Sequence, residues 1–146
     1  MSFRRALAAI SLVFLLAGCN ITNQYYEDVE GVGKQIVADW KELPEVVKAE
    51  YGYKHGLDQG QLVYATATVR DESVEKSVAQ LEEIAQRDYW RGTWQDVSLY
   101  VTVYSDANPE TVSPTGASKP YSEKRIELDD PAALEKKYGP RPEKKK

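Results

Sequence analysis

Cysteine and histidine are almost absent from this chain of 146 residues, which holds one of each, Cys19 and His55. With a single cysteine, no disulfide can form within the chain, and a folded domain has to rest on its hydrophobic core. The sequence also lacks a Gly-x-Ser-x-Gly elbow and a His-x-x-x-His pair. Because nucleophilic hydrolysis and zinc binding depend on such groups, we expect no enzyme, no metal site and no other cofactor.

Positive charge is in deficit, with 19 Lys and Arg against 23 Asp and Glu, a net charge of −4. A domain of this sign repels phosphate backbones, which argues against nucleic acid as a partner. The acidic pairs do not follow the spacing of a calcium loop. One basic run, residues 144–146 at the C-terminus, is a solvated tail or a contact for anionic lipid or wall polymer.

Long apolar runs are missing except for one near the start, residues 6–17, which follows Arg4 and Arg5. Twelve residues of helix span about 18 Å, whereas the hydrocarbon core of a bilayer is roughly 30 Å thick. The run is thus short for a transmembrane helix and has the length of a signal-peptide core. We therefore expect residues 1–18 to be a signal peptide, exported by the general secretory route or, given the arginine pair, by the twin-arginine route.

The apolar run ends in Leu16-Ala17-Gly18-Cys19. This tetrapeptide resembles the lipobox of bacterial lipoproteins, and the chain resembles the small lipoproteins of bacterial envelopes. The resemblance implies cleavage before Cys19, acylation of its thiol, and a lipid anchor that holds the mature chain on the extracytoplasmic side of the cell membrane. Loss of Arg4 and Arg5 would shift the net charge from −4 to −6.

Residues 19–28 lack periodicity and are expected to form a lipidated tether, followed by one domain over residues 29–128 and a charged tail over 129–146 that holds a possible short helix. Apolar residues at helical spacing predict two amphipathic helices, led by Val29 and Val74. Alternating patterns predict strands at 46–54, 62–70, 97–104 and 121–128, with a loop at 105–120. The expected fold is α+β, in the order α-β-β-α-β-β. It has one small antiparallel sheet of three or four strands and both helices on one face.

The tyrosines offer the one candidate site within the predicted domain. If the apolar positions of strands 62–70 and 97–104 face the helices, then alternate residues share the opposite face of the sheet. These candidates for a binding face are Tyr64, Thr66, Thr68, Tyr100, Thr102 and Tyr104. Grouped aromatic residues of this kind are typical of contact surfaces for proteins or sugars. Two other interpretations remain open, namely that the segment 121–138 covers this face, or that the pairs only stabilise the sheet.

The sequence thus predicts a membrane-anchored lipoprotein of the cell envelope, whose domain is a non-catalytic binding or structural module. Its expected partners are the lipid bilayer, through acylated Cys19, and an envelope protein or a wall polymer. The alternative is a protein that binds a small ligand, an amphiphile or a sugar, between the sheet and the C-terminal segment.

Overall fold

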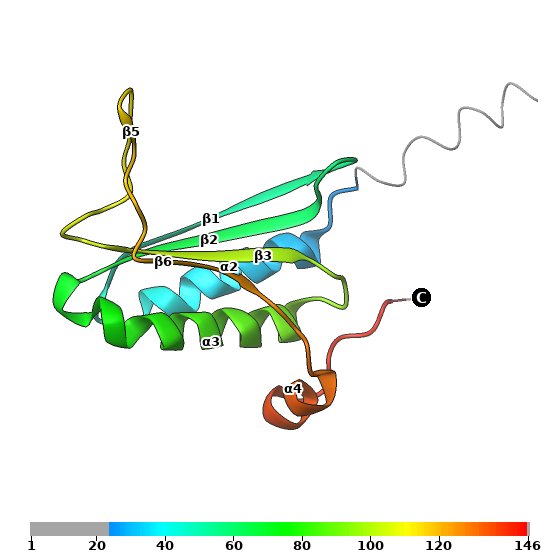
Figure 1. Ribbon diagram of the computed structural model, residues 1–146. Helices are drawn as coiled ribbons and strands as arrows, with labels where there is room; N and C mark the ends of the chain where they lie inside the picture. Colours follow the sequence, from blue (N-terminus) through cyan, green and yellow to red (C-terminus); the bar gives the residue numbers. More distant parts are fainter. Residues whose placement is uncertain (1–23, 146) are drawn as a thin grey trace, which may run out of the picture.

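The computed structural model describes residues 24–145. The elements are α2 (Glu27–Lys41), β1 (Val46–Gly56), β2 (Gly60–Val69), the 3-10 turn η1 (Asp71–Ser73), α3 (Val74–Gly92), β3 (Ser98–Ser105), β4 (Val112–Ser113), β5 (Gly116–Ala117), β6 (Ser122–Ile126) and α4 (Pro131–Tyr138). Four strands form one sheet in the order β1-β2-β3-β6, with α2 and α3 on the same face (Figure 1). The predicted α+β class, the four strands and the two helices on one face are confirmed.

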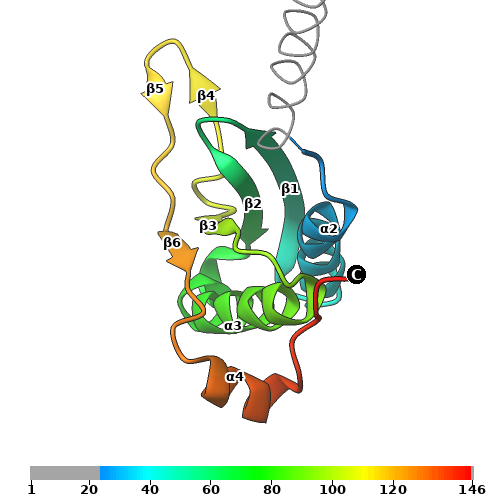
Figure 2. The ribbon, with the colours of Figure 1, turned by 90° about the vertical axis from the view of Figure 1, so that its right-hand side faces the viewer.

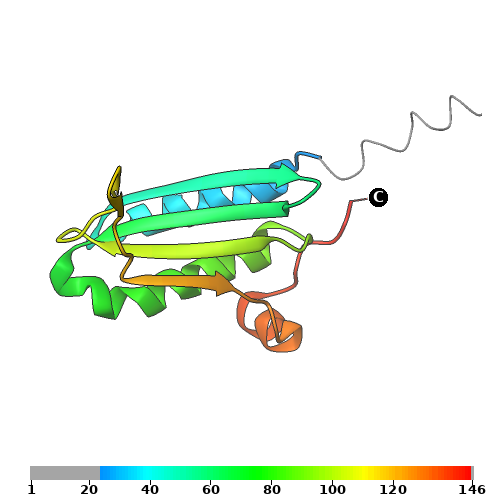
Figure 3. The same ribbon diagram turned by 45° about the horizontal axis from the view of Figure 1, so that its top comes forward.

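The direction of one strand pair differs from the expectation. β1 and β2 are antiparallel, as are β3 and β6, but β2 and β3 run parallel, so the sheet is mixed and not antiparallel. The physical reason is α3, which carries the chain from the end of β2 back to the start of β3 along the sheet (Figure 3). A helical crossover of this length returns the next strand in the same direction as the one before.

The core lies between the sheet and the two helices. The alternate residues Val63, Ala65, Ala67 and Val69 of β2 are fully buried against it, as the strand pattern predicts. Trp40 joins the two helices, because its buried indole N–H donates to the carbonyl of Leu81 at 3.1 Å. In β1 the register shifts between Val46 and Lys48, which leaves Val47 58 % exposed although its alternation predicts an inward position.

Both ends of the domain extend further than the sequence suggests. α2 begins at Glu27, inside the segment expected to be a tether. Three acidic residues in its first turn stabilise the helix, because they lie at the positive end of its dipole. At the other end, α4 is not part of a loose tail. The helix lies beside α3 (Figure 2), and its residues Leu134 and Tyr138 pack against Trp90. Asp130 caps α4 by accepting from the Ala133 amide. The β4–β5 hairpin occupies part of the predicted loop.

Candidate functional site

The face of the sheet opposite the helices carries most of the predicted binding residues. We call it the open face and define it by the even-numbered residues of β2 and β3 whose side chains are at least partly exposed: Leu62, Tyr64, Thr66, Ser98, Tyr100 and Thr102. Tyr64 and Tyr100 are direct neighbours in the parallel pair, and their rings stack with centroids 6.1 Å apart. Gly52 of β1 lies on the other side of Tyr64 and adds no side chain there. The two rings therefore form a raised aromatic pair near the middle of the sheet.

A shallow groove of about 360 Å³ runs beside this aromatic pair. Leu62, both tyrosines, Ser98 and Thr102 line it, together with Gln59 of the β1–β2 turn and Glu123 of β6. Charges of both signs surround the aromatic pair. The Lys54 ammonium lies 5.5 Å from the centre of the Tyr64 ring. The ion pair Lys48–Glu50 lies on β1, and the ion pair Arg125–Glu127 lies at the end of β6. The result is an aromatic centre with a polar rim.

Two of the predicted residues, Thr68 and Tyr104, do not belong to this surface. They are neighbours in the β2–β3 pair and are only 7 % and 8 % exposed. The chain leaves the sheet just beyond Tyr104 and re-enters beside it, where the Tyr121 amide donates to the carbonyl of Val103. Burial raises the pKa of Tyr104, and the nearby carboxylates of Glu110 and Glu123 act in the same direction. The prediction was wrong at these two positions because alternation identifies a face of the sheet but not what covers it.

The part of the C-terminal segment that follows β6 does not cover the open face (Figure 2), whereas Glu123 of β6 lines its groove. α4 lies on the helical side of the molecule (Figure 2), where the Trp90 indole donates to the carbonyl of Gly139 at 2.8 Å. Beyond α4, the Arg141 guanidinium donates to the carbonyls of Thr93 and Gln95. Of the basic run at the C-terminus, Lys144 lies 5.3 Å from the Trp94 ring, and residue 146 is outside the described part of the chain.

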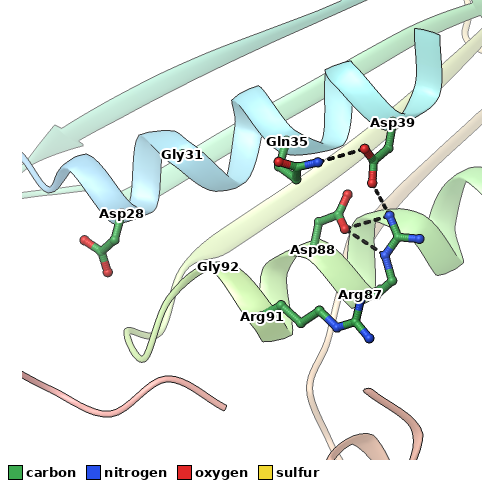
Figure 4. Close-up of a pocket in the computed structure, with 8 residues that line it drawn as sticks. All are labelled: Asp28, Gly31, Gln35, Asp39, Arg87, Asp88, Arg91 and Gly92. Atoms are coloured by element: carbon green, nitrogen blue, oxygen red, sulfur yellow. Dashed lines mark hydrogen bonds and ion pairs between the residues drawn. The ribbon is translucent and has the colours of Figure 1, made fainter. Parts of the chain in front are cut away.

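A second hollow, which the sequence analysis missed, lies between α2 and α3. We call it the interhelical groove. It measures about 580 Å³ and is lined by Asp28, Gly31, Gln35 and Asp39 of α2 and by Arg87, Asp88, Arg91 and Gly92 of α3 (Figure 4). One sequence feature could have revealed it. Asp88 follows Leu81 and Ala85 at the helical spacing of the buried stripe, where an apolar residue is expected.

The remaining residues considered as candidates, His55 and the acidic side chains, form no catalytic or metal-binding cluster within residues 24–145. His55 belongs to an aromatic cluster, with its ring centroid 5.3 Å from Tyr53 and 6.0 Å from Tyr25. Within residues 24–145, histidine and acidic side chains nowhere gather in threes as metal ligands would. Cys19 and the signal peptide lie outside the described residues.

None of the helices within residues 24–145 has the length and apolar character needed to span a bilayer. Comparisons of the chain with protein families, with curated proteins and with solved structures give no significant match.

Proposed function

We propose that the chain is an extracytoplasmic lipoprotein, anchored in the cell membrane by acylated Cys19, and that its domain is a non-catalytic binding module. The open face is its contact surface, with Tyr64 and Tyr100 at the centre. The proposed location rests on the lipobox of residues 16–19. The binding role rests on one observation, the stacked and partly exposed tyrosine pair beside an open groove on the uncovered side of the sheet.

The chemistry of the open face favours a protein as the partner. Protein interfaces typically combine a centre rich in tyrosine with a polar, charged rim. The open face has this arrangement, with Lys48–Glu50 on one outer strand and Arg125–Glu127 beside the other. A wall polymer is the other candidate, because stacked rings beside hydroxyl groups also suit a sugar chain.

The short tether is consistent with a surface that works near the membrane. Gln24 is five residues after Cys19, and five steps of at most about 3.5 Å span about 17 Å. The described chain begins at the end of the sheet that holds the β1–β2 turn, whereas the β4–β5 hairpin projects from the opposite end (Figure 1). An anchor at Cys19 therefore keeps the first end close to the bilayer and places the hairpin away from it.

A cross-linking experiment in intact cells tests both parts of the proposal. Tagged full-length protein is compared with the double variant Tyr64→Ser/Tyr100→Ser, and Tyr25→Ser serves as the control. Tyr25 is 49 % exposed and packs near Tyr53, away from the open face. A Cys19→Ser variant tests the anchor through incorporation of radiolabelled palmitate.

We expect the double variant to lose a cross-linked partner that the parent and Tyr25→Ser retain. The aromatic pair contributes about 0.5–1.5 kcal/mol beyond its buried area, so the double variant should still fold. An unchanged set of cross-linked proteins would refute the binding role of this face. If the parent protein retains only a polysaccharide, the partner is a wall polymer and not a protein. Equal palmitate labelling of Cys19→Ser and the parent would refute the anchor.

A further inference from the structure

Asp88 is a buried carboxylate, and only one of its two oxygens has a partner among residues 24–145. Its side chain is 4 % exposed and projects from α3 across the interhelical groove toward α2 (Figure 4). One oxygen, Oδ1, accepts a hydrogen bond from Nε of Arg87 at 2.8 Å and forms an ion pair with Nη2 of the same residue, also at 2.8 Å. The other, Oδ2, is buried and has no hydrogen-bond partner within residues 24–145. A buried polar atom of this kind needs an explanation, because leaving it unpaired costs about 1–3 kcal/mol.

Stability alone does not explain an aspartate at this position. Asp88 continues the buried stripe of α3, in which Leu81 and Ala85 contribute to the core. An apolar side chain there would avoid the desolvation of a carboxylate, and replacing buried ionic groups by apolar ones is often neutral or stabilising. A costly charged group that lines a groove is a candidate for ligand recognition.

The groups around Asp88 indicate which kind of ligand would suit its unpaired oxygen. The Arg87 guanidinium is already engaged, since it binds Asp39 as well as Asp88. The Gln35 amide N–H donates to Asp39 at 2.7 Å, and the Arg91 Nε donates to the carbonyl of Tyr138. The open position at Asp88 therefore calls for a hydrogen-bond donor. The lining holds three carboxylates and two guanidinium groups, an excess of one negative charge that favours a cationic donor.

We propose that the interhelical groove binds the primary ammonium group of a small organic ligand, which donates to Oδ2 of Asp88. Because Oδ2 of Asp88 is buried, a side chain of the groove has to move to admit the ligand, and the proposal assigns this movement to Gln35, an exposed residue of the lining. A volume of about 580 Å³ lies within the range of small-molecule sites. At Gly31 a Cβ atom would meet nothing within 4 Å, so the wall of α2 is open there. This site is independent of the contact surface proposed on the sheet.

Primary ammonium groups occur on amino sugars, on alkyl diamines and on the ethanolamine headgroup of lipids. Three probes, one for each class, distinguish these sources. Full-length protein in detergent micelles is titrated by calorimetry at pH 6.5 and low salt with glucosamine, 1,4-diaminobutane and ethanolamine. Glucose, 1,4-butanediol and ethylene glycol are the matched neutral compounds. We expect at least one amine to bind about tenfold or more tightly than its neutral counterpart, as a charge-assisted hydrogen bond requires.

Two variants tie the binding to the groove. Asp88→Asn removes the charge with little change of shape and should weaken the amine about tenfold or more. Gly31→Leu adds a side chain to the groove at a position where its Cβ meets nothing within 4 Å, and it replaces a helix-interior glycine. We expect this variant to fold and to bind no amine. Glu75→Gln removes one charge from an exposed position of the same helix outside the groove, and it should leave the affinity within about twofold.

Three results would overturn the proposal. The first is that none of the three amines binds the parent protein. The second is that each neutral compound binds as tightly as its amine. The third is that Gly31→Leu and Asp88→Asn, shown to be folded by circular dichroism, bind the amine as the parent does.

Discussion

Replacing Gly31 or Gly33 of α2 with alanine gains the same helix propensity, about 1 kcal/mol for alanine over glycine in a helix interior. The two positions differ in what the added methyl group meets. At Gly31 there is nothing within 4 Å. At Gly33 the new Cβ would lie 2.7 Å from Cδ2, 3.0 Å from Cγ and 3.2 Å from Cβ of Tyr51. These atoms are at the base of the ring and cannot swing away easily, since the Tyr51 hydroxyl also donates to Glu30 at 3.2 Å.

Because the propensity gain cancels between the two variants, the difference in their stability measures the contact with Tyr51. Overpacking of a well-packed site costs about 1–3 kcal/mol. We therefore expect Gly31→Ala to be more stable than the parent by about 0.5–1 kcal/mol. Gly33→Ala should be less stable than Gly31→Ala by about 1–3 kcal/mol, equivalent to a melting temperature lower by about 3–10 °C for a domain of this size.

Thermal and urea unfolding of the full-length variants, followed by circular dichroism, measures these differences. A double-mutant cycle with Tyr51→Ala identifies the contact, since the cost of Gly33→Ala should largely disappear once the ring is gone. If Gly33→Ala proves as stable as Gly31→Ala, the close approach of α2 to β1 at this point is refuted.

Two further predictions concern Asp88 and α4. Burial, and the neighbouring Asp39 to a smaller extent, raises the pKa of Asp88 against the opposing effect of Arg87, so the folded state holds this proton more tightly than the unfolded state. The free energy of unfolding of the parent, relative to that of Asp88→Asn, should consequently fall as pH rises from about 3.9 through the folded-state pKa. Urea unfolding across this pH range measures the difference. A constant or rising difference would contradict the burial of this group. Leu134→Ala should lower the free energy of unfolding by about 2 kcal/mol and release α4 from α3. Limited proteolysis should then cut the chain after residue 128 while the rest of the domain stays protected. Equal protection of the variant and the parent would show that Leu134 does not hold the helix.

The helices and strands could be predicted from local sequence patterns, because each of them has one buried side. Alternation in β2 correctly assigns Val63 and Val69 to the core, and helical spacing does the same for Val29 and Leu81. The parallel pairing of β2 with β3 was not accessible in this way. Alternation is the same in parallel and antiparallel strands, and the path of the crossover through α3 decides between them.

The candidate site on the sheet was accessible only in part. Tyr64 and Tyr100 lie on the open face as the pattern predicts, whereas Tyr104 is buried where the chain leaves and re-enters the sheet. The interhelical groove was missed because its walls come from two helices far apart in the sequence. The aspartate at position 88 was a visible irregularity in an apolar stripe, but its half-satisfied state depends on Arg87 and on the packing of α2.

The sequence by itself determined most of the residues that form the core, the order of the main helices and strands, and the lipobox that predicts the anchor at Cys19. These properties follow from local spacing and local chemistry, which the order of residues contains in full. Only the tertiary structure decided the mixed sheet, the docking of α4 on α3, the limits of the open face and the interhelical groove. Each of these depends on contacts between segments distant in the chain, and such contacts are set by how the whole core packs.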